Sequence, residues 1–129
     1  MAWVHMVVAL ALIEFLYFGY EVGRARTRYQ VRAPATTGNE LFERYFRVQM
    51  NTLELLVVFI PSILIFGHYL SPYVAAVLGA VFLIGRYLYF AAYVKDPARR
   101  ELGYALSSAP TGILLVGAIF GAARAIPYS

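Results

Sequence analysis

Four long apolar stretches limit the fold of this chain more than any other feature. They run from Met1 to Val22, Leu53 to Gly67, Pro72 to Val94 and Leu102 to Ile126 within 129 residues. Each approaches or exceeds the roughly 20 apolar residues with which a helix crosses a bilayer. A soluble domain of this size could not bury a composition that is 61% apolar and 14% charged. We therefore predict one all-α integral membrane domain over residues 1–129, with helices at about 2–32, 38–67, 72–95 and 97–126.

The positions of the basic residues predict the topology. Six arginines lie between the first two stretches, at positions 24, 26, 28, 32, 44 and 47, and Lys95, Arg99 and Arg100 lie between the last two. The connection between the second and third stretches has no Lys or Arg. Both basic loops are therefore expected in the cytoplasm and both termini on the opposite side, in an up-down-up-down bundle. Membrane topology explains the net charge of +4, so we expect membrane lipid and no nucleic acid as a partner.

Local signals place the helix boundaries. Thr37 to Glu40 fits a capping box at the start of the second helix. Ser71-Pro72 and Asp96-Pro97 each place an N-cap before a first-turn proline, at the third and fourth helices. Pro61 and Pro110 fall inside expected helices, where a membrane-embedded helix tolerates proline.

The fourth stretch is rich in small residues. It contains Gly117-x-x-x-Gly121 and a run of small side chains, Ala105, Ser107, Ser108, Ala109 and Gly112. Such faces let helix backbones approach closely in lipid, either within one bundle or between subunits. Because four helices alone enclose little volume, we expect an oligomer.

The residue inventory excludes several kinds of chemistry. The chain has no cysteine, so disulfides, thiolate metal sites and a protein thiol nucleophile are excluded. His5 and His68 are far apart, which gives no support to a metal site or a catalytic triad. Any sulfur chemistry would therefore use the thiol of a substrate, and no metal is expected.

Ionisable residues inside the apolar stretches need a partner or a function, since each costs at least about 2.5 to 3.5 kcal/mol on insertion scales. Arg47, Asn51 and Glu54 follow i, i+4, i+7 spacing and share one face of the second helix. Glu14, in the first helix, stands apart from them. It could pair with an arginine, bind a proton or make a polar contact between helices.

A second polar face lies on the third helix, where Arg86, Tyr89 and Tyr93 follow i, i+3, i+7 spacing. Both polar faces fall in the cytoplasmic half of the membrane and can face each other. Together they suit a ligand with several carboxylates and an amine. The alternative is structural, in which Arg86 and Glu54 form a buried ion pair and the tyrosines belong to the interfacial belt.

Two segments carry a resemblance to a known family. Residues 42–54 read FERYFRVQMNTLE and residues 85–93 read GRYLYFAAY. Combined, they resemble the MAPEG family, the membrane-associated proteins in eicosanoid and glutathione metabolism, from about Glu21 to Ile126. The Thr36-Thr37-Gly38 segment before the second helix resembles the corresponding segment in the branch of the family that contains glutathione transferases and leukotriene synthases.

The resemblance implies a homotrimer that binds glutathione as co-substrate at each subunit interface, open to the cytoplasm. The implied activity is conjugation of glutathione to hydrophobic electrophiles, with peroxide reduction as a further activity. The thiolate-activating arginine would be Arg100. The implied glutathione contacts are Arg26, Arg47, Gln49, Asn51, Glu54, Arg86, Tyr89 and Tyr93.

Two departures from the family pattern and two rival interpretations remain. Leu55 stands where the leukotriene synthase group has tyrosine, and Arg99 beside Arg100 leaves the activating residue open by one position. One rival is a non-catalytic lipid-binding member of the same family, which would not need Arg100. The other is a small proton-coupled multidrug exporter that uses Glu14, which would not need the two polar faces.

Overall fold

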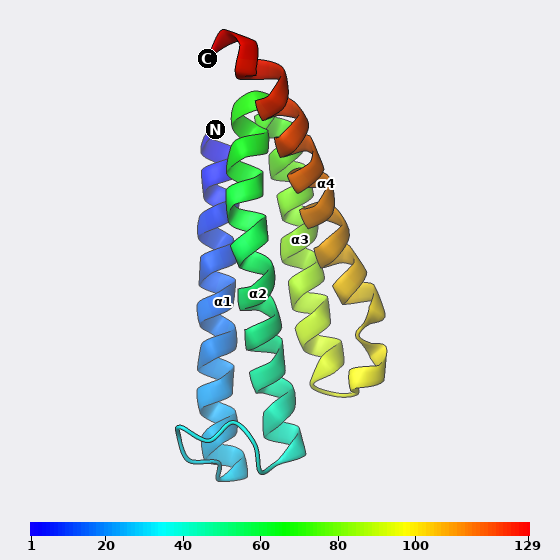
Figure 1. Ribbon diagram of the computed structural model, residues 1–129. Coiled ribbons are helices and arrows are strands. Elements are labelled where there is room, and N and C mark those ends of the chain that lie inside the picture. The colour runs from blue at the N-terminus through cyan, green and yellow to red at the C-terminus, as the bar shows by residue number, and fades with distance from the viewer.

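The protein is a bundle of four long helices joined by short connections (Figure 1). The computed structural model describes residues 1–129 and contains no strand. The helices are α1 (Ala2–Tyr29), α2 (Glu40–Tyr69), α3 (Pro72–Tyr93) and α4 (Glu101–Ala125), with two short 3₁₀ helices, η1 (Pro97–Arg99) and η2 (Ile126–Tyr128). All four long helices are long and apolar enough to cross a membrane, which confirms the predicted class of fold.

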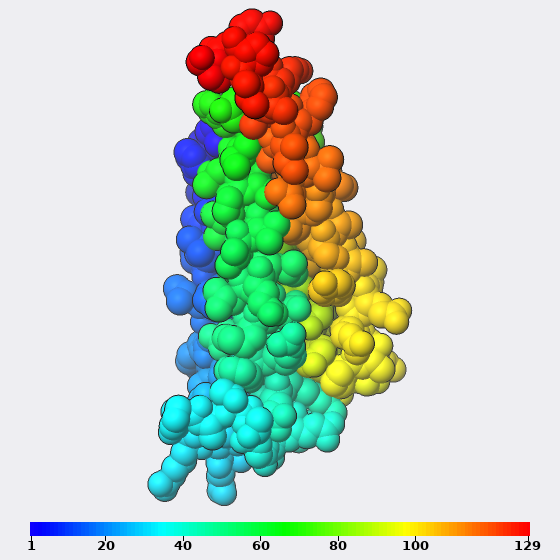
Figure 2. All heavy atoms as spheres, in the orientation of Figure 1, coloured from blue at the N-terminus to red at the C-terminus, as the bar shows by residue number.

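The helices run alternately up and down the bundle. Both termini lie at one end, and the 30–39 and 94–100 connections lie at the other, as Figure 1 shows. In Figure 2 the C-terminal turn extends past the other helices at its end of the bundle. The two basic loops therefore share one end of the molecule.

The ends of α1 and α2 differ from those predicted. α1 ends at Tyr29 because Gln30 adopts a left-handed conformation, with φ 57° and ψ 46°. The cap of α2 is Asn39, whose Oδ1 accepts a hydrogen bond from the Phe42 N–H at 3.0 Å. The predicted capping box beginning at Thr37 is therefore wrong, since Asn39 is the residue that satisfies the first turn.

The third and fourth helices begin in different ways. Ser71 Oγ accepts from the Val74 N–H at 3.2 Å with Pro72 in the first turn, which confirms the predicted start of α3. Asp96 instead caps η1, accepting from the Ala98 N–H at 3.1 Å. α4 therefore begins at Glu101 and not near residue 97 as predicted, because a 3₁₀ turn intervenes.

Packing in the bundle includes a fully buried aromatic stack and close backbone approaches. Phe59 of α2 and Phe82 of α3 are fully buried and stack with their ring centroids 3.8 Å apart. A Cβ on Gly103 of α4 would overlap the backbone of Tyr89, so α3 and α4 touch at this point.

The Gly117-x-x-x-Gly121 motif also packs within the chain. A Cβ on Gly117 would overlap the Phe66 ring, and one on Gly121 would lie 2.7 Å from Tyr69 Cβ. Of the two interpretations of this motif, packing within the bundle is therefore the one that the structure supports for these glycines.

Candidate functional site

The centre of the site is Arg86 on α3, whose side chain is fully buried. Its Nε donates to Ser107 Oγ of α4 at 2.8 Å. Its Nη1 donates to Asn51 Oδ1 at 2.7 Å and to Thr52 Oγ1 at 3.2 Å, both on α2. One guanidinium thus connects three helices in the apolar part of the bundle. Its Nη2 is buried and has no hydrogen-bond partner in the chain.

The two hydroxyls that accept hydrogen bonds from Arg86 are oriented by their own helices. Ser107 donates to the Gly103 carbonyl at 2.6 Å, and Thr52 donates to the Val48 carbonyl at 2.8 Å. Because each hydroxyl proton is already directed at a backbone oxygen, the hydroxyl lone pairs are left to accept from Arg86. Arg86 is therefore held by neutral oxygens.

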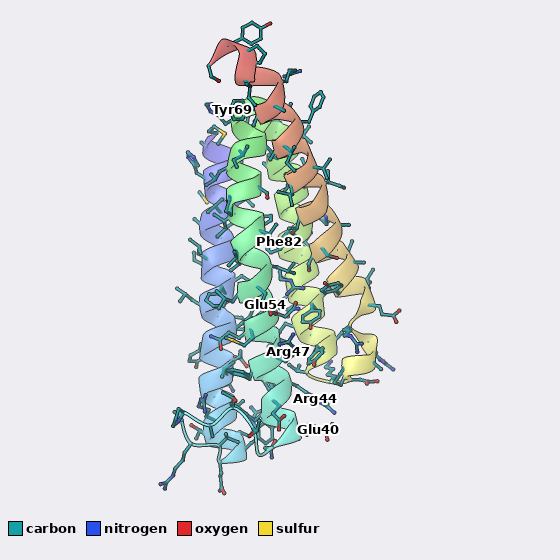
Figure 3. All side chains as sticks on the ribbon, in the orientation of Figure 1. Glu40, Arg44, Arg47, Glu54, Tyr69 and Phe82 are labelled. Carbon is teal, nitrogen blue, oxygen red and sulfur yellow. The ribbon has the colours of Figure 1, made fainter.

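The alternative of a buried Arg86–Glu54 ion pair is wrong. Glu54 instead lies 3.6 Å from Arg47, and both side chains are more than half exposed. Figure 3 shows Glu40, Arg44, Arg47 and Glu54 along α2 from the loop end toward the middle. Exposed charges in a helix that can span a membrane are costly against lipid, so this face needs a polar cover.

Aromatic side chains continue the site along α3. The Arg86 Cζ lies 4.5 Å from the centroid of the Tyr89 ring, a cation–π distance. Tyr89 is buried and stacks with the half-buried Tyr93 at a centroid distance of 5.3 Å. The tyrosines form an aromatic path from the buried arginine toward the loop end.

At that end the two tyrosines lead to a small cavity of about 410 Å³. Arg47 and Tyr93 line it from α2 and α3, and Pro97 lines it from η1. Arg44, which also lines the cavity, donates to the carbonyls of Val94 and Lys95 at 3.3 and 3.0 Å. These bonds fix the 94–96 connection against α2, at the mouth of the site.

The two adjacent arginines before α4 have different partners. The Arg100 side chain is exposed, and its Nη1 donates at 3.0 Å to the carbonyl of Pro97, a residue that lines the cavity. Arg99 lies 3.9 Å from Asp96 and pairs with it at the surface.

Two of the predicted site residues lie elsewhere in the chain. Arg26, near the end of α1, donates to the Ala35 carbonyl at 2.7 Å and lines a separate cavity of about 950 Å³ under the 30–38 loop. Gln49 faces α1, where its Nε2 would lie 2.9 Å from a Cβ on Gly19. One chain therefore brings together the predicted residues Arg47, Asn51, Glu54, Arg86, Tyr89 and Tyr93, and Arg100 bonds to Pro97 at the edge of the cavity.

Sequence reasoning missed two members of the site, Thr52 and Ser107. In the sequence, Ser107 stands out for its small size alone. The signals in the sequence were Ser107, four residues after Gly103, and Thr52, directly after Asn51. Both lie in membrane helices, where hydroxyl groups form hydrogen bonds between helices. The chain has no group of three or more His, Asp or Glu residues that could hold a metal ion.

The fold and the site together define a class of protein. Its members are four-helix membrane proteins in which charged residues and tyrosines line a site within the membrane-spanning helices. Within this class, the MAPEG family model matches residues 4–120. Human microsomal glutathione S-transferase 2 is 39% identical over 88% of this chain and 75% of the relative. Guinea-pig (Cavia porcellus) leukotriene C4 synthase is 33% identical over 89% of this chain and 77% of the relative.

An uncharacterised protein of Synechocystis is more similar still, at 49% identity over 91% of this chain and 85% of the relative. The chain therefore belongs to the MAPEG family. With four helices able to span a membrane, it is an integral, multi-pass membrane protein.

Proposed function

We propose that this protein is a membrane-bound glutathione transferase that conjugates the glutathione thiolate to hydrophobic electrophiles. The names of two relatives, a glutathione S-transferase and leukotriene C4 synthase, support the class of reaction. The observation that carries the proposal is the exposed Arg47–Glu54 pair on a membrane-spanning helix, next to the buried Arg86 network.

The charged groups of glutathione are complementary to those of Arg47 and Glu54 on this face. Its two carboxylates suit guanidiniums, and its α-amine suits a carboxylate. In the proposal Arg47 holds a carboxylate and Glu54 the amine, so the ligand replaces the long 3.6 Å contact between them. Asn51 and Arg86 provide the floor, and Tyr89 and Tyr93 provide the wall of the site.

The proposed activating residue is Arg100. A free thiol has a pKa of about 8.5, so most of it is protonated at neutral pH. A guanidinium beside the sulfur favours the thiolate, and the N-terminus of α4, which begins at Glu101, adds its positive dipole. Each unit by which the thiol pKa falls corresponds to about 1.4 kcal/mol of preferential thiolate binding. Arg100 acts through charge, and the thiol proton passes to water.

The proposal includes a homotrimer with glutathione at each subunit interface, open to a cytoplasmic loop end. A second subunit would cover the exposed charged face of α2, which lipid cannot cover without cost. Arg26 and Gln49, which lie off this face, would then reach glutathione held on a neighbouring subunit. The full set of proposed contacts is Arg26, Arg47, Gln49, Asn51, Glu54, Arg86, Tyr89 and Tyr93.

An apolar groove along α4 supports access for the electrophile from the membrane. Ala109, Gly112, Val116 and Phe120 line it, and a Cβ on Gly112 would meet no atom within 4 Å. A hydrophobic electrophile dissolved in lipid could enter by such a surface without crossing water. Hydrophobic peroxides are a second class of substrate for the same thiolate.

The test is glutathione conjugation to chlorodinitrobenzene by the purified protein, beside Arg100→Ala and Arg99→Ala. In this reaction the sulfur forms a bond to the ring carbon and chloride leaves. We expect turnover by the wild type, its loss in Arg100→Ala, and its retention in Arg99→Ala. The thiolate absorbance of bound glutathione should be lost in Arg100→Ala alone. Glutathione binding without turnover towards several electrophiles would instead indicate a non-catalytic binding protein.

A further inference from the structure

The buried charge of Arg86 has no counter-ion among its hydrogen-bond partners. All three partners are neutral, an amide oxygen from Asn51 and hydroxyls from Thr52 and Ser107. A fully buried guanidinium cannot lose its charge, so it is costly unless an anion lies close by. We therefore expect a carboxylate near Arg86 Nη2, the nitrogen that its three hydrogen bonds leave without a partner.

The register of α1 against α3 identifies that carboxylate. The two helices run in the same direction (Figure 1). Val7 packs on Gly79, where a Cβ would lie 2.5 Å from the valine Cγ1, and Phe18 stacks on Phe90 at a centroid distance of 5.1 Å. Both pairs are 72 residues apart in sequence, as Glu14 and Arg86 are.

Glu14 and Arg86 therefore lie at the same level of two facing helices, two turns beyond one contact and one turn before the other. Their unpaired atoms are complementary. Glu14 Oε1, an acceptor, and Arg86 Nη2, a donor, are both buried without a hydrogen-bond partner in the chain. The two atoms do not bond to each other directly in the structure, so one bridging water molecule or a small shift of either side chain would join them and satisfy both.

The other acidic residues of α1 and α2 that could compete are paired already. Glu21 pairs with Arg24 at 3.2 Å, and Glu54 pairs with Arg47. We propose that Glu14 is the counter-ion of Arg86 and, by holding the guanidinium between α1, α2 and α4, a positioning residue for the glutathione-binding face. The second half rests on the proposed function, whereas the first does not.

A double-mutant cycle tests the charge pair without any assay of activity. Thermal unfolding is measured for wild type, Glu14→Gln, Arg86→Gln and the double variant, in mildly alkaline buffer and one detergent. Glu14→Gln keeps the shape but leaves the arginine charge buried alone, so its melting temperature should fall well below that of wild type. The double variant, with neither charge, should melt above Glu14→Gln. The control Glu40→Gln removes the charge of an exposed carboxylate that pairs with Arg44, and it should leave the melting temperature unchanged.

Either of two results would overturn the proposal that Glu14 is the counter-ion of Arg86. One is an unchanged melting temperature for Glu14→Gln, and the other is a double variant in which the effects of the two single changes simply add. Glu14→Asp, which keeps the charge, should lie between wild type and Glu14→Gln. A greater loss in the aspartate variant than in the glutamine variant would indicate a packing role and also overturn the proposal.

Glutathione binding by calorimetry tests the positioning role separately. We expect Glu14→Gln to weaken binding by at least about tenfold, because the arginine that forms the floor of the site loses its anchor. If the unfolding cycle shows coupling between Glu14 and Arg86 but Glu14→Gln binds glutathione as tightly as wild type, Glu14 remains the counter-ion and its positioning role is overturned. If the wild type itself binds no glutathione, the proposed function fails with the positioning role, while the unfolding cycle still decides the ion pair.

Discussion

The carboxylate of Glu54 lies 3.6 Å from the guanidinium of Arg47, on one face of α2 and at an exposed position. The two residues are seven apart, which places them on the same side of the helix two turns from each other. An exposed pair of this kind stabilises a fold by about 0 to 1 kcal/mol, so it contributes little to stability. Its charges are therefore free to serve a ligand.

Glu54→Gln should separate binding from stability. Losing the carboxylate removes the proposed partner of the glutathione amine, which we expect to weaken glutathione binding roughly 10- to 100-fold. The melting temperature should stay near that of wild type, since the lost pair is exposed. Calorimetric titration with glutathione checks the affinity, and Glu40→Gln, which removes the charge of another exposed α2 carboxylate, the partner of Arg44, is the matched control. Equal affinity in Glu54→Gln and wild type would contradict the role given to Glu54.

Ser107→Ala should destabilise the protein although it removes a single oxygen. Arg86 Nε would lose its acceptor inside the bundle, and an unsatisfied buried donor costs about 1 to 3 kcal/mol. The neighbouring Ser108 offers a close control, because it makes the same bond to its own helix, to the Tyr104 carbonyl at 2.7 Å, but receives nothing from Arg86. Thermal unfolding of both variants should show a loss in Ser107→Ala alone, and equal melting temperatures would refute the assignment.

Sequence periodicity predicted much of this architecture, because an apolar stretch of the right length has few structures available to it in a membrane. The same-face groups on α2 and α3 followed from the 3.6-residue repeat. The partners of Arg86 did not follow, since they depend on how α3 is rotated against α2 and α4. That rotation is set by close approaches such as Gly103 against Tyr89, which no single helix reveals. The pairing of Arg86 with Glu54 was wrong for this reason.

Gly103→Ala should disturb the site through the backbone. The added methyl group would overlap the backbone nitrogen of Tyr89, so α4 must move away from α3. Such overpacking typically costs about 1 to 3 kcal/mol, and it would move the Tyr89 ring that lies against Arg86. We expect a lower melting temperature together with weaker glutathione binding. Gly23→Ala, where a Cβ meets no atom within 4 Å, should melt no lower than wild type. Similar behaviour of the two variants would contradict the close α3–α4 contact.

Arg44→Ala should loosen the mouth of the site. Arg44 holds the end of α3 by its bonds to the Val94 and Lys95 carbonyls and also pairs with Glu40 at 3.2 Å. Without it, the 94–100 connection that carries Arg100 loses its attachment to α2. We expect faster amide hydrogen exchange in peptides covering residues 94–100 and a KM for glutathione raised several-fold, because a mobile connection must be ordered again on binding. Glu40→Gln removes the ion pair but keeps both carbonyl bonds, so its exchange should match that of wild type. Faster exchange in both variants would assign the effect to the ion pair instead.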